Sequence, residues 1–319
     1  MDNLTHSLVG VLLGQTGLKR KTALATPTLI IAANLPDIDA ACFFWLHGAE
    51  HLGFRRGITH GPIAMLLLPL LLWGIMLGWD RWLRRGKADR PAVHRGWLLA
   101  LAYVGCLSHP ALDWLNVYGI RLLEPFSSRW FYGDSIFIID VWLWAGLIAA
   151  IIGARRRDRS GQDGGRVAWI ALVAISAYIF VNGLITGRAE ARTHALLAQV
   201  RGVTAEMVVA SPPPLAFWRR DIFWRGTLNG VGYYGSFHNN IFDGGEPVAA
   251  GGGLSRPSGM DNPRLAAIAA TNSEVRAFLL WSRMPVARFL PDGRLILSDQ
   301  RFGDPRVADR FTVVAKPAR

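Results

Sequence analysis

The strongest constraint on this chain is a set of long apolar runs, all placed before residue 188. They cover residues 62–79, 97–107, 136–154 and 167–187. A membrane-spanning helix needs about 20 predominantly apolar residues, and three of these runs meet or approach that length. The run that begins at residue 97 reaches it only by taking in His109 and Asp113. Two shorter runs, at 8–13 and 22–33, predict a hairpin of short or re-entrant helices. We therefore expect about six helical segments.

Positive charge is concentrated in short loops beside these runs. The formal net charge is +12 at pH 7, and the cations gather in residues 18–21, 80–95 and 155–159. A nucleic-acid ligand would also attract such charge. The positive-inside rule explains the placement better, because each cluster flanks an apolar run. We expect membrane lipid as the partner and no nucleic acid.

The basic loops also predict an orientation. If they face the cytoplasm, the loops at 40–61 and 119–135 lie outside, and so does everything after residue 187. The first residues do not resemble a removable signal peptide, because their basic cluster follows the first apolar run. Six polar residues then fall at the outer face: His6, Asp37, Asp39, His60, His109 and Asp113. The orientation rests on the basic loops alone, so this agreement supports a shared site.

The chemistry of these six residues favours a metal. His109 and Asp113 are one helical turn apart and project from the same helix face. A histidine or carboxylate at membrane depth is costly unless it is paired, hydrated or bound to a metal. Three histidines and three carboxylates form a ligand set that Zn²⁺, Mn²⁺ or Fe²⁺ accepts. The sequence therefore predicts a metal site formed by residues from four stretches of chain.

Each part of this pattern has a simpler interpretation that stays open. His6 and His60 could be interfacial histidines without a ligand, and Asp37 and Asp39 could only terminate a helix. Asp113 is harder to explain in that way, because it lies inside an apolar run. Cys42 and Cys106 are not in a C-x-x-C spacing, so thiolate zinc and redox sites are not expected. A disulfide between them stays open, and burial as small apolar residues is favoured.

The predicted outer loop around PFSSRWFYGD supplies further candidates. Arg121 or Arg129 could bind a phosphate through two parallel hydrogen bonds. Snorkelling to the membrane interface or contact with lipid headgroups is the favoured interpretation for each arginine. Asp134 and Asp140 are candidates for the outer shell of the site, where a carboxylate would orient a ligating histidine.

The sequence changes character at residue 188, where a polar-to-amphipathic helix is expected over 188–200. Strands are predicted within 215–238, with a turn at Asn229-Gly230. Further elements are a Gly-rich loop at 244–257, a helix at 273–282, a hairpin at 287–297 and a closing strand at 311–315. We expect a helical membrane domain over 1–187 that carries the metal site and a small extracytoplasmic α+β domain over 188–319.

The segments MDNLTHSLVG, NLPDID, RRGITHGP and SHPALDWLNVYGIRLLEPFSSRWFYGD occur in this order. Over about residues 1–190 they resemble the YdjM/YbcI family of bacterial inner-membrane proteins, and the resemblance implies a metal-dependent hydrolase. The order His, Asp, His and His-x-x-x-Asp is also similar to part of the ligand set of zinc-dependent phospholipase C and the single-strand-specific zinc nucleases.

This second resemblance implies how the ligands would be shared. Asp39 or Asp37 would hold one metal together with His60, His109 and Asp113, and His6 would begin a second site with Asp113 as the bridge. The soluble enzymes have a further His-x-x-x-Asp/Glu pair and an N-terminal tryptophan, which this sequence lacks. One or two ions are therefore expected, with Zn²⁺ preferred.

We expect a multi-pass protein of the bacterial inner membrane that hydrolyses a lipid ester or phosphodiester at the outer face. Whichever of Asp37 and Asp39 does not bind the metal would be the general base. The first alternative is an ion transporter or a proton-coupled transporter, whose ligands would come from both sides of the membrane. The second is a scaffold without catalytic activity, whose C-terminal domain binds a partner.

Overall fold

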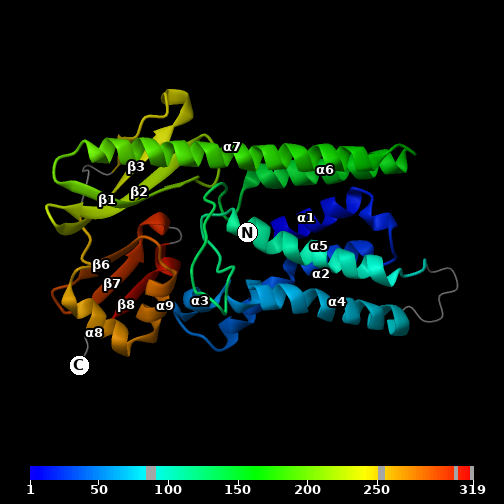
Figure 1. Ribbon diagram of the computed structural model, residues 1–319, viewed down its shortest axis with the longest axis horizontal. Helices are drawn as coiled ribbons and strands as arrows, with labels where there is room; N and C mark the ends of the chain where they lie inside the picture. The colour runs from blue at the N-terminus through cyan, green and yellow to red at the C-terminus, as the bar shows by residue number, and fades with distance from the viewer. Residues whose placement is uncertain (84–90, 251–255, 305–307, 317–319) are drawn as a thin grey trace. The chain divides into compact units, whose positions relative to one another are not determined.

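The computed structural model describes residues 1–83, 91–250, 256–304 and 308–316 (Figure 1). Parts of the expected loops at 80–95 and 244–257 lie outside these residues. The chain forms two compact units, one of Met1–Asp39 with Arg56–Asn182 and one of Ala40–Arg55 with Gly183–Arg319. The structure thus groups residues 40–55 with the C-terminal part, and a functional boundary at residue 187 stays a prediction.

The first unit is helical, and every helical segment expected from the apolar runs is present. Its helices are α1 (Asn3–Gln15), α2 (Ala25–Asn34), α4 (Pro62–Leu83), α5 (Arg95–Trp114), α6 (Val141–Arg159) and the first part of α7 (Gly164–Ala198). The 3₁₀ segment Leu35–Phe44 continues α2, and a short 3₁₀ turn, Ile58–His60, precedes α4. Asp2 begins α1 by accepting hydrogen bonds from the backbone N–H groups of Leu4 and Thr5.

Three helical segments in the described part of the chain are long and apolar enough to cross a membrane. They are Ala25–Phe44, Pro62–Trp82 and Gly164–Ala198. The run at 22–33, expected to be short, gains length because the apolar helical segment continues to Phe44. By this measure three spans are supported, and the arrangement with about six membrane segments stays a prediction.

The surface of these segments is what a bilayer requires. Only 17% of the apolar window in Pro62–Trp82 and 11% of that in Gly164–Ala198 is buried within the protein. On α4, Leu66, Leu67 and Leu71 are each more than half exposed. Contiguous apolar surface of this extent is rare on proteins that face water. Together with the helix lengths, it indicates a membrane protein.

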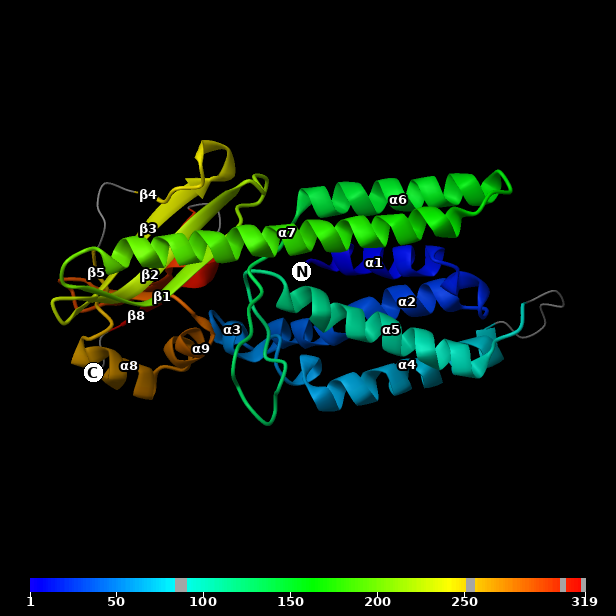
Figure 2. The ribbon, with the colours of Figure 1, turned by 45° about the horizontal axis from the view of Figure 1, so that its top comes forward.

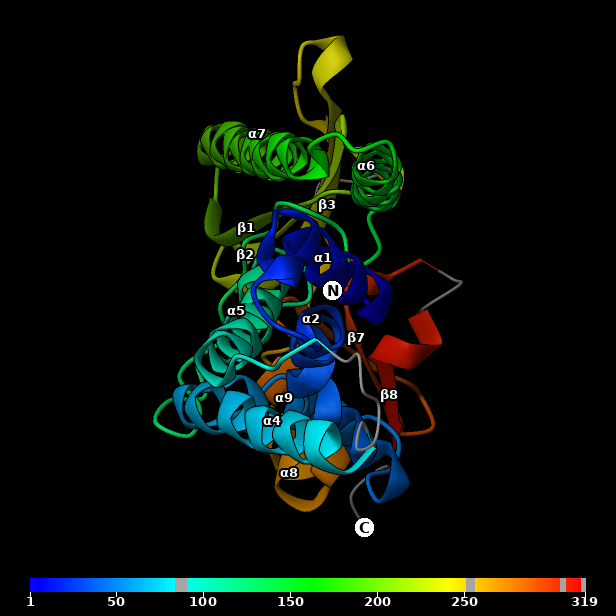
Figure 3. The same ribbon diagram turned by 90° about the vertical axis from the view of Figure 1, so that its right-hand side faces the viewer.

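Helix α2 is central to the packing, because it contacts α1, α4 and α5 (Figure 3). Ala32 of α2 shares a buried cluster with Leu72 and Met76 of α4 and with Leu98 and Ala102 of α5. A second cluster joins α1 to α6 and α7 through Leu12, Leu143, Leu147 and Ala168. These contacts hold the ends of α1, α2, α4 and α5 in fixed relation, and those ends carry the candidate ligands.

The described residues of the second unit form two antiparallel sheets. The first has the order β1 (Val203–Ser211), β2 (Arg219–Leu228), β3 (Val231–Asn240) and β4 (Val248–Ala249), with β5 (Arg256–Pro257) also paired to β3. The second has the order β6 (Pro285–Phe289), β7 (Leu295–Asp299) and β8 (Thr312–Ala315). The helices of this unit are α3 (Glu50–Phe54), α8 (Pro263–Thr271), α9 (Ser273–Trp281) and the end of α7.

One face of the first sheet packs on α7, where Ala189 and Leu197 meet Ile222, Trp224 and Phe237. The predicted turn at Asn229-Gly230 is confirmed: both residues have positive φ, 51° and 83°, as a two-residue hairpin turn requires. The hairpin expected at 287–297, the helix at 273–282 and the strand at 311–315 are also confirmed. The strand β1 and the helices α3 and α8 were not expected.

Candidate metal centre

Four helix ends of the first unit meet at the site (Figure 2). His6 is in the first turn of α1, Asp37 follows the end of α2, and His60 comes two residues before α4 begins. His109 and Asp113 are in the last turns of α5. Because α1 and α4 start where α2 and α5 end, all five side chains share one end of the helices. The side chains of His6, His60, His109 and Asp113 are fully buried.

The two histidines His60 and His109 face each other. Their Nε2 atoms are 3.1 Å apart, and Asp113 Oδ2 lies 3.6 Å from the first and 3.5 Å from the second. Asp37 Oδ1 lies 3.9 Å from His109 Nε2. Ligand atoms of Asp37, His60 and His109 all fall within 4.8 Å of one another. These atoms are therefore close enough together to bind one cation.

The opposite nitrogen of each ring fixes the tautomer. His109 Nδ1 lies 2.7 Å from the carbonyl oxygen of Ala33, which only accepts, so Nδ1 carries the proton. His60 Nδ1 lies 2.9 Å from the Thr59 hydroxyl, which in turn lies 3.2 Å from Asp39 Oδ2. Since the carboxylate accepts from Thr59, His60 Nδ1 donates to that hydroxyl. In the neutral imidazoles both Nε2 atoms are then unprotonated, so neither can donate to the other across the 3.1 Å that separate them.

The position of Asp39 differs from that of Asp37. Asp39 Oδ2 accepts the backbone N–H of Arg56 at 2.7 Å and lies 3.7 Å from His60 Nδ1. It is therefore beside the nitrogen that points away from His109. Of the two carboxylates that the sequence left open as ligands, Asp37 lies on the Nε2 side and Asp39 behind His60.

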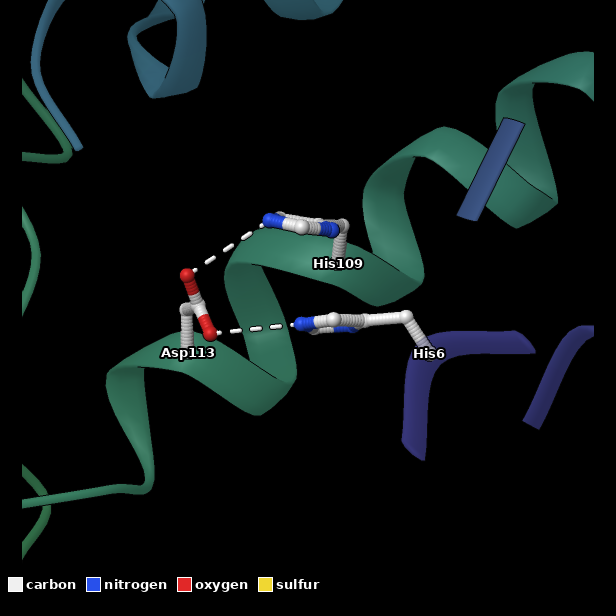
Figure 4. Close-up of side chains that lie close together, drawn as sticks. All are labelled: His6, His109 and Asp113. Atoms are coloured by element: carbon white, nitrogen blue, oxygen red, sulfur yellow. Dashed lines mark ion pairs between the residues drawn. The ribbon is translucent and has the colours of Figure 1, made fainter. Parts of the chain in front are cut away.

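His6 extends the cluster on the other side of Asp113. Its ring stacks on His109 with centroids 3.8 Å apart and planes 17° apart. Its Nε2 lies 3.4 Å from Asp113 Oδ1, while His109 approaches Oδ2 (Figure 4). Neither ring nitrogen of His6 makes a hydrogen bond within the described part of the chain, although both are buried. Such buried polar atoms normally have a partner.

Asp113 is surrounded by cationic and amide groups that the sequence did not single out. Arg56 Nε lies 3.0 Å from Oδ2, and the Met1 amino nitrogen contacts Oδ1. Arg56 also donates to Asn116 Oδ1 and to the Gly119 carbonyl oxygen, both at 3.1 Å. Each residue has one indication in the sequence. Arg56 is four residues before His60, and Asn116 is three residues after Asp113, so both are close in sequence to a candidate ligand.

The outer-loop residues have different surroundings. Arg121 is buried. Its Nη1 lies 3.6 Å from Glu124 Oε2, and its Cζ lies 5.3 Å from the centre of the Trp130 ring. Burial lowers the pKa of its guanidinium, and the charges of Glu124, Tyr118 and Asp39 act in the opposite direction. The backbone N–H of Arg121 donates to the carbonyl oxygen of Arg56 at 3.0 Å. Arg129 is exposed and lies over the Phe131 ring.

The two carboxylates predicted for the outer shell are both buried. Asp134 has a left-handed backbone, with φ 46°. Asp140 begins α6 by accepting from the N–H groups of Trp142 and Leu143, and its Oδ2 accepts from the Tyr178 hydroxyl at 3.0 Å. These contacts tie Asp140 to α6 and α7. The two cysteines, Cys42 and Cys106, are free and buried, as favoured from the sequence.

The residues present fit a divalent cation. In a tetrahedral zinc site with Zn–N bonds of about 2.0–2.1 Å, two ligating nitrogens are separated by about 3.3 Å, and the two Nε2 atoms here are 3.1 Å apart. The donors are imidazole nitrogens and carboxylate oxygens, which suit Zn²⁺ and its neighbours. The outer nitrogens of His60 and His109 are held as those of metal-ligating histidines usually are. The unsatisfied nitrogens of His6 are consistent with a second ion.

The fold and the site define a helical membrane protein with a buried histidine and carboxylate cluster that could hold a metal ion. The chain belongs to the YdjM inner membrane protein family, whose profile matches residues 1–189. This confirms the family suggested by the sequence motifs. The matched residues include the whole candidate centre.

The chain is also similar to the uncharacterized protein YfhP of Bacillus subtilis (strain 168). The two are 26% identical over 159 residues, which are 47% of this chain and 45% of that protein. The similarity thus spans less than half the length of this relative. No solved structure matches the chain significantly.

Proposed function

We propose that this protein is a metal-dependent hydrolase of the bacterial inner membrane, acting on a lipid ester or phosphodiester at the outer face. The observation that carries the proposal is the pair of unprotonated Nε2 atoms of His60 and His109, 3.1 Å apart. Two lone pairs at this distance repel each other unless a cation or a proton lies between them. With Asp113 and Asp37 beside them, a divalent cation is the better match.

The proposed orientation in the membrane follows from the difference between the two ends of the helices in the first unit. The candidate ligands lie at one end of the helices, and basic residues gather at the other. There, Lys19 pairs with Asp158 at 2.5 Å, close to the arginines that end α6. Under the positive-inside rule this second end faces the cytoplasm, which puts the cluster outside. Six membrane segments and an extracytoplasmic C-terminal domain belong to the same proposal.

His60, His109, Asp113 and Asp37 would hold the first cation, and His6 with Asp113 Oδ1 would begin a second site. A divalent cation at this place supplies Lewis-acid polarisation of an ester or phosphoryl oxygen and lowers the pKa of a water molecule. Asp37 is the better candidate for the carboxylate ligand, because Asp39 lies behind His60. Asp39 and Thr59 instead hold the His60 ring and its tautomer.

Arg121 would bind the anionic part of the substrate. Its side chain is buried, and its backbone N–H donates to the carbonyl oxygen of Arg56, whose side chain pairs with Asp113. A planar guanidinium matches two oxygens of a phosphoryl group. We expect Arg121→Gln to raise KM for a phosphodiester more than tenfold, while the exposed Arg129→Gln serves as the matched control and changes KM little.

The test is the activity of detergent-purified protein on panels of phospholipids, soluble phosphodiesters and carboxylic esters. Hydrolysis of one panel that stops on chelation and returns with Zn²⁺ or Mn²⁺ is the expected result. Uptake of metal ions or protons into proteoliposomes without hydrolysis would favour the transporter instead. Reporter fusions at Asp158 and at the C-terminus test the orientation: the first should report the cytoplasm and the second the outside.

A further inference from the structure

The second unit contains a cavity of 660 Å³ between its two sheets. One wall of the cavity is the face of the first sheet that carries Phe223, Tyr234 and Ser236. This face is opposite the one that packs on α7. The other wall is the face of the second sheet that carries Val286, Arg288, Ile296 and Ser298. Cavities of about 300–1,000 Å³ are typical of small-molecule sites.

Main-chain hydrogen bonds connect the two sheets beside this cavity. The N–H of Ser258 donates to the Gly232 carbonyl oxygen of β3, and its own carbonyl oxygen accepts the N–H of Ala287 in β6, both at 2.9 Å. The carbonyl oxygen of Ala287 also lies where a side chain on Gly259 would be. Such close backbone contact fixes the spacing of the sheets, so the cavity is a built feature of this unit.

The lining of the cavity is positively charged. Arg256 and Arg288 line it, and its carboxylate, Asp299, is already paired with Arg301 at 2.9 Å. Arg225 lies directly across from Tyr234 in the sheet, on the same face. Its Nε is buried and makes no hydrogen bond within the described residues. Charge of this kind attracts an anion.

Gln300 is a second residue that indicates a binding site. This residue lines the cavity, and both its Oε1 and Nε2 are buried without a hydrogen-bond partner in the described part of the chain. An amide in this state is unfavourable unless a ligand or water satisfies it. The side-chain amide offers one acceptor oxygen and two donor hydrogens, so it would form hydrogen bonds with a polar group of the ligand next to the anionic group.

We propose that this cavity binds a small organic anion. A phosphate or carboxylate group would lie against Arg288 and Arg256, a hydrogen-bonding group against Gln300, and an apolar body against Phe223 and Tyr234. Arginine matches such groups through two parallel hydrogen bonds. This site lies wholly within the second unit and takes no part in the proposed hydrolysis.

The test uses benzylphosphonate, which combines a phosphonate with an aromatic body and has no ester bond to hydrolyse. Full-length protein in detergent is titrated by calorimetry, with benzyl alcohol as the probe that lacks the charge. We expect saturable binding of benzylphosphonate and none of benzyl alcohol at the same concentrations. Equal binding of the two probes, or no binding of benzylphosphonate, would overturn the proposal.

Variants test whether benzylphosphonate binds in this cavity or elsewhere on the protein surface. Arg288→Gln and Arg256→Gln should each weaken benzylphosphonate binding at least tenfold, with unchanged far-ultraviolet circular dichroism, because both arginines line the cavity. Arg294→Gln is the matched control, because Arg294 is half-exposed and pairs with Asp292 outside the cavity. Unchanged affinity in both cavity variants would contradict the assignment. Metal content should be the same in all three variants, which keeps this test independent of the candidate metal centre.

Discussion

Gly10 of α1 and Gly105 of α5 both lie against the carbonyl oxygen of Leu29 in α2. A Cβ atom would come within 2.8 Å of that oxygen at Gly10 and within 2.9 Å at Gly105. The missing side chains let the three helix backbones approach closely. His6 is one turn before Gly10 and His109 one turn after Gly105, so this approach brings the two imidazole rings into their stack.

Gly105→Ala should therefore separate α5 from α2 and disturb the centre. We expect metal affinity to fall at least tenfold and the melting temperature to drop by several degrees, although alanine is the better helix former by about 1 kcal/mol. The matched control is Gly74→Ala in α4, where nothing lies within 4 Å of the added atom. If Gly105→Ala is as stable and as metal-rich as the control, close packing on α2 is not what positions the histidines.

Asp37 and Asp39 should respond differently to conversion into asparagine. Asp37→Asn removes a charged donor on the Nε2 side and should lower metal affinity strongly. Asp39→Asn leaves the donors in place but weakens the support of His60, for which a loss of about 10–100-fold is typical. Metal affinity measured by competition with a chelating dye orders the two variants. A larger loss in Asp39→Asn would reverse the assignment.

Asp299 predicts a pH dependence of the second unit. Burial raises the pKa of its carboxyl, but the charge and hydrogen bonds of Arg301 and the hydrogen bond from Ser282 outweigh burial and hold the pKa below its usual range. A depressed pKa stabilises the folded state above the unfolded-state pKa, and this contribution is lost as the pH falls through the folded-state value.

Asp299→Asn should therefore cost about 3 kcal/mol at pH 7, because both partners of the pair are buried. The difference from the parent protein should shrink as the pH falls below about 4. Pulse proteolysis in urea, read from C-terminal fragments, measures it. Asp292→Asn, in the exposed pair with Arg294, is the control and should change stability little at any pH. A difference for Asp299→Asn that does not depend on pH would contradict this account.

Much of the helical unit follows from the sequence, because long apolar runs have few ways to satisfy their backbone in lipid. The Asn229-Gly230 pair likewise predicted a tight turn between two strands, which the structure contains. The strand β1 was harder to find, because its pairing shifts between Ala205 and Met207 and breaks the alternation of a regular strand. Helix α8 had a signal, an asparagine cap followed by proline at Asn262-Pro263.

For the candidate centre, the sequence predicted which residues share one end of the helices but not how they meet. The difference between Asp37 and Asp39 depends on the 3₁₀ turn Leu35–Phe44, in which side chains two residues apart point in different directions. The stack of His6 on His109 depends on the two glycine contacts with Leu29. The role of Arg56 at Asp113 depends on a contact across 57 positions of the chain, which spacing cannot predict.

The metal content of the His109→Ala variant tests the central claim most directly. The parent protein, purified without chelators and measured by mass spectrometry of its metals, should contain one or two divalent ions per chain. His109→Ala should lose them while it still inserts into the membrane, and His47→Ala, which alters an exposed histidine, should keep them. A parent protein without metal, or a His109→Ala variant with the full content, would contradict a metal centre built on His60, His109 and Asp113.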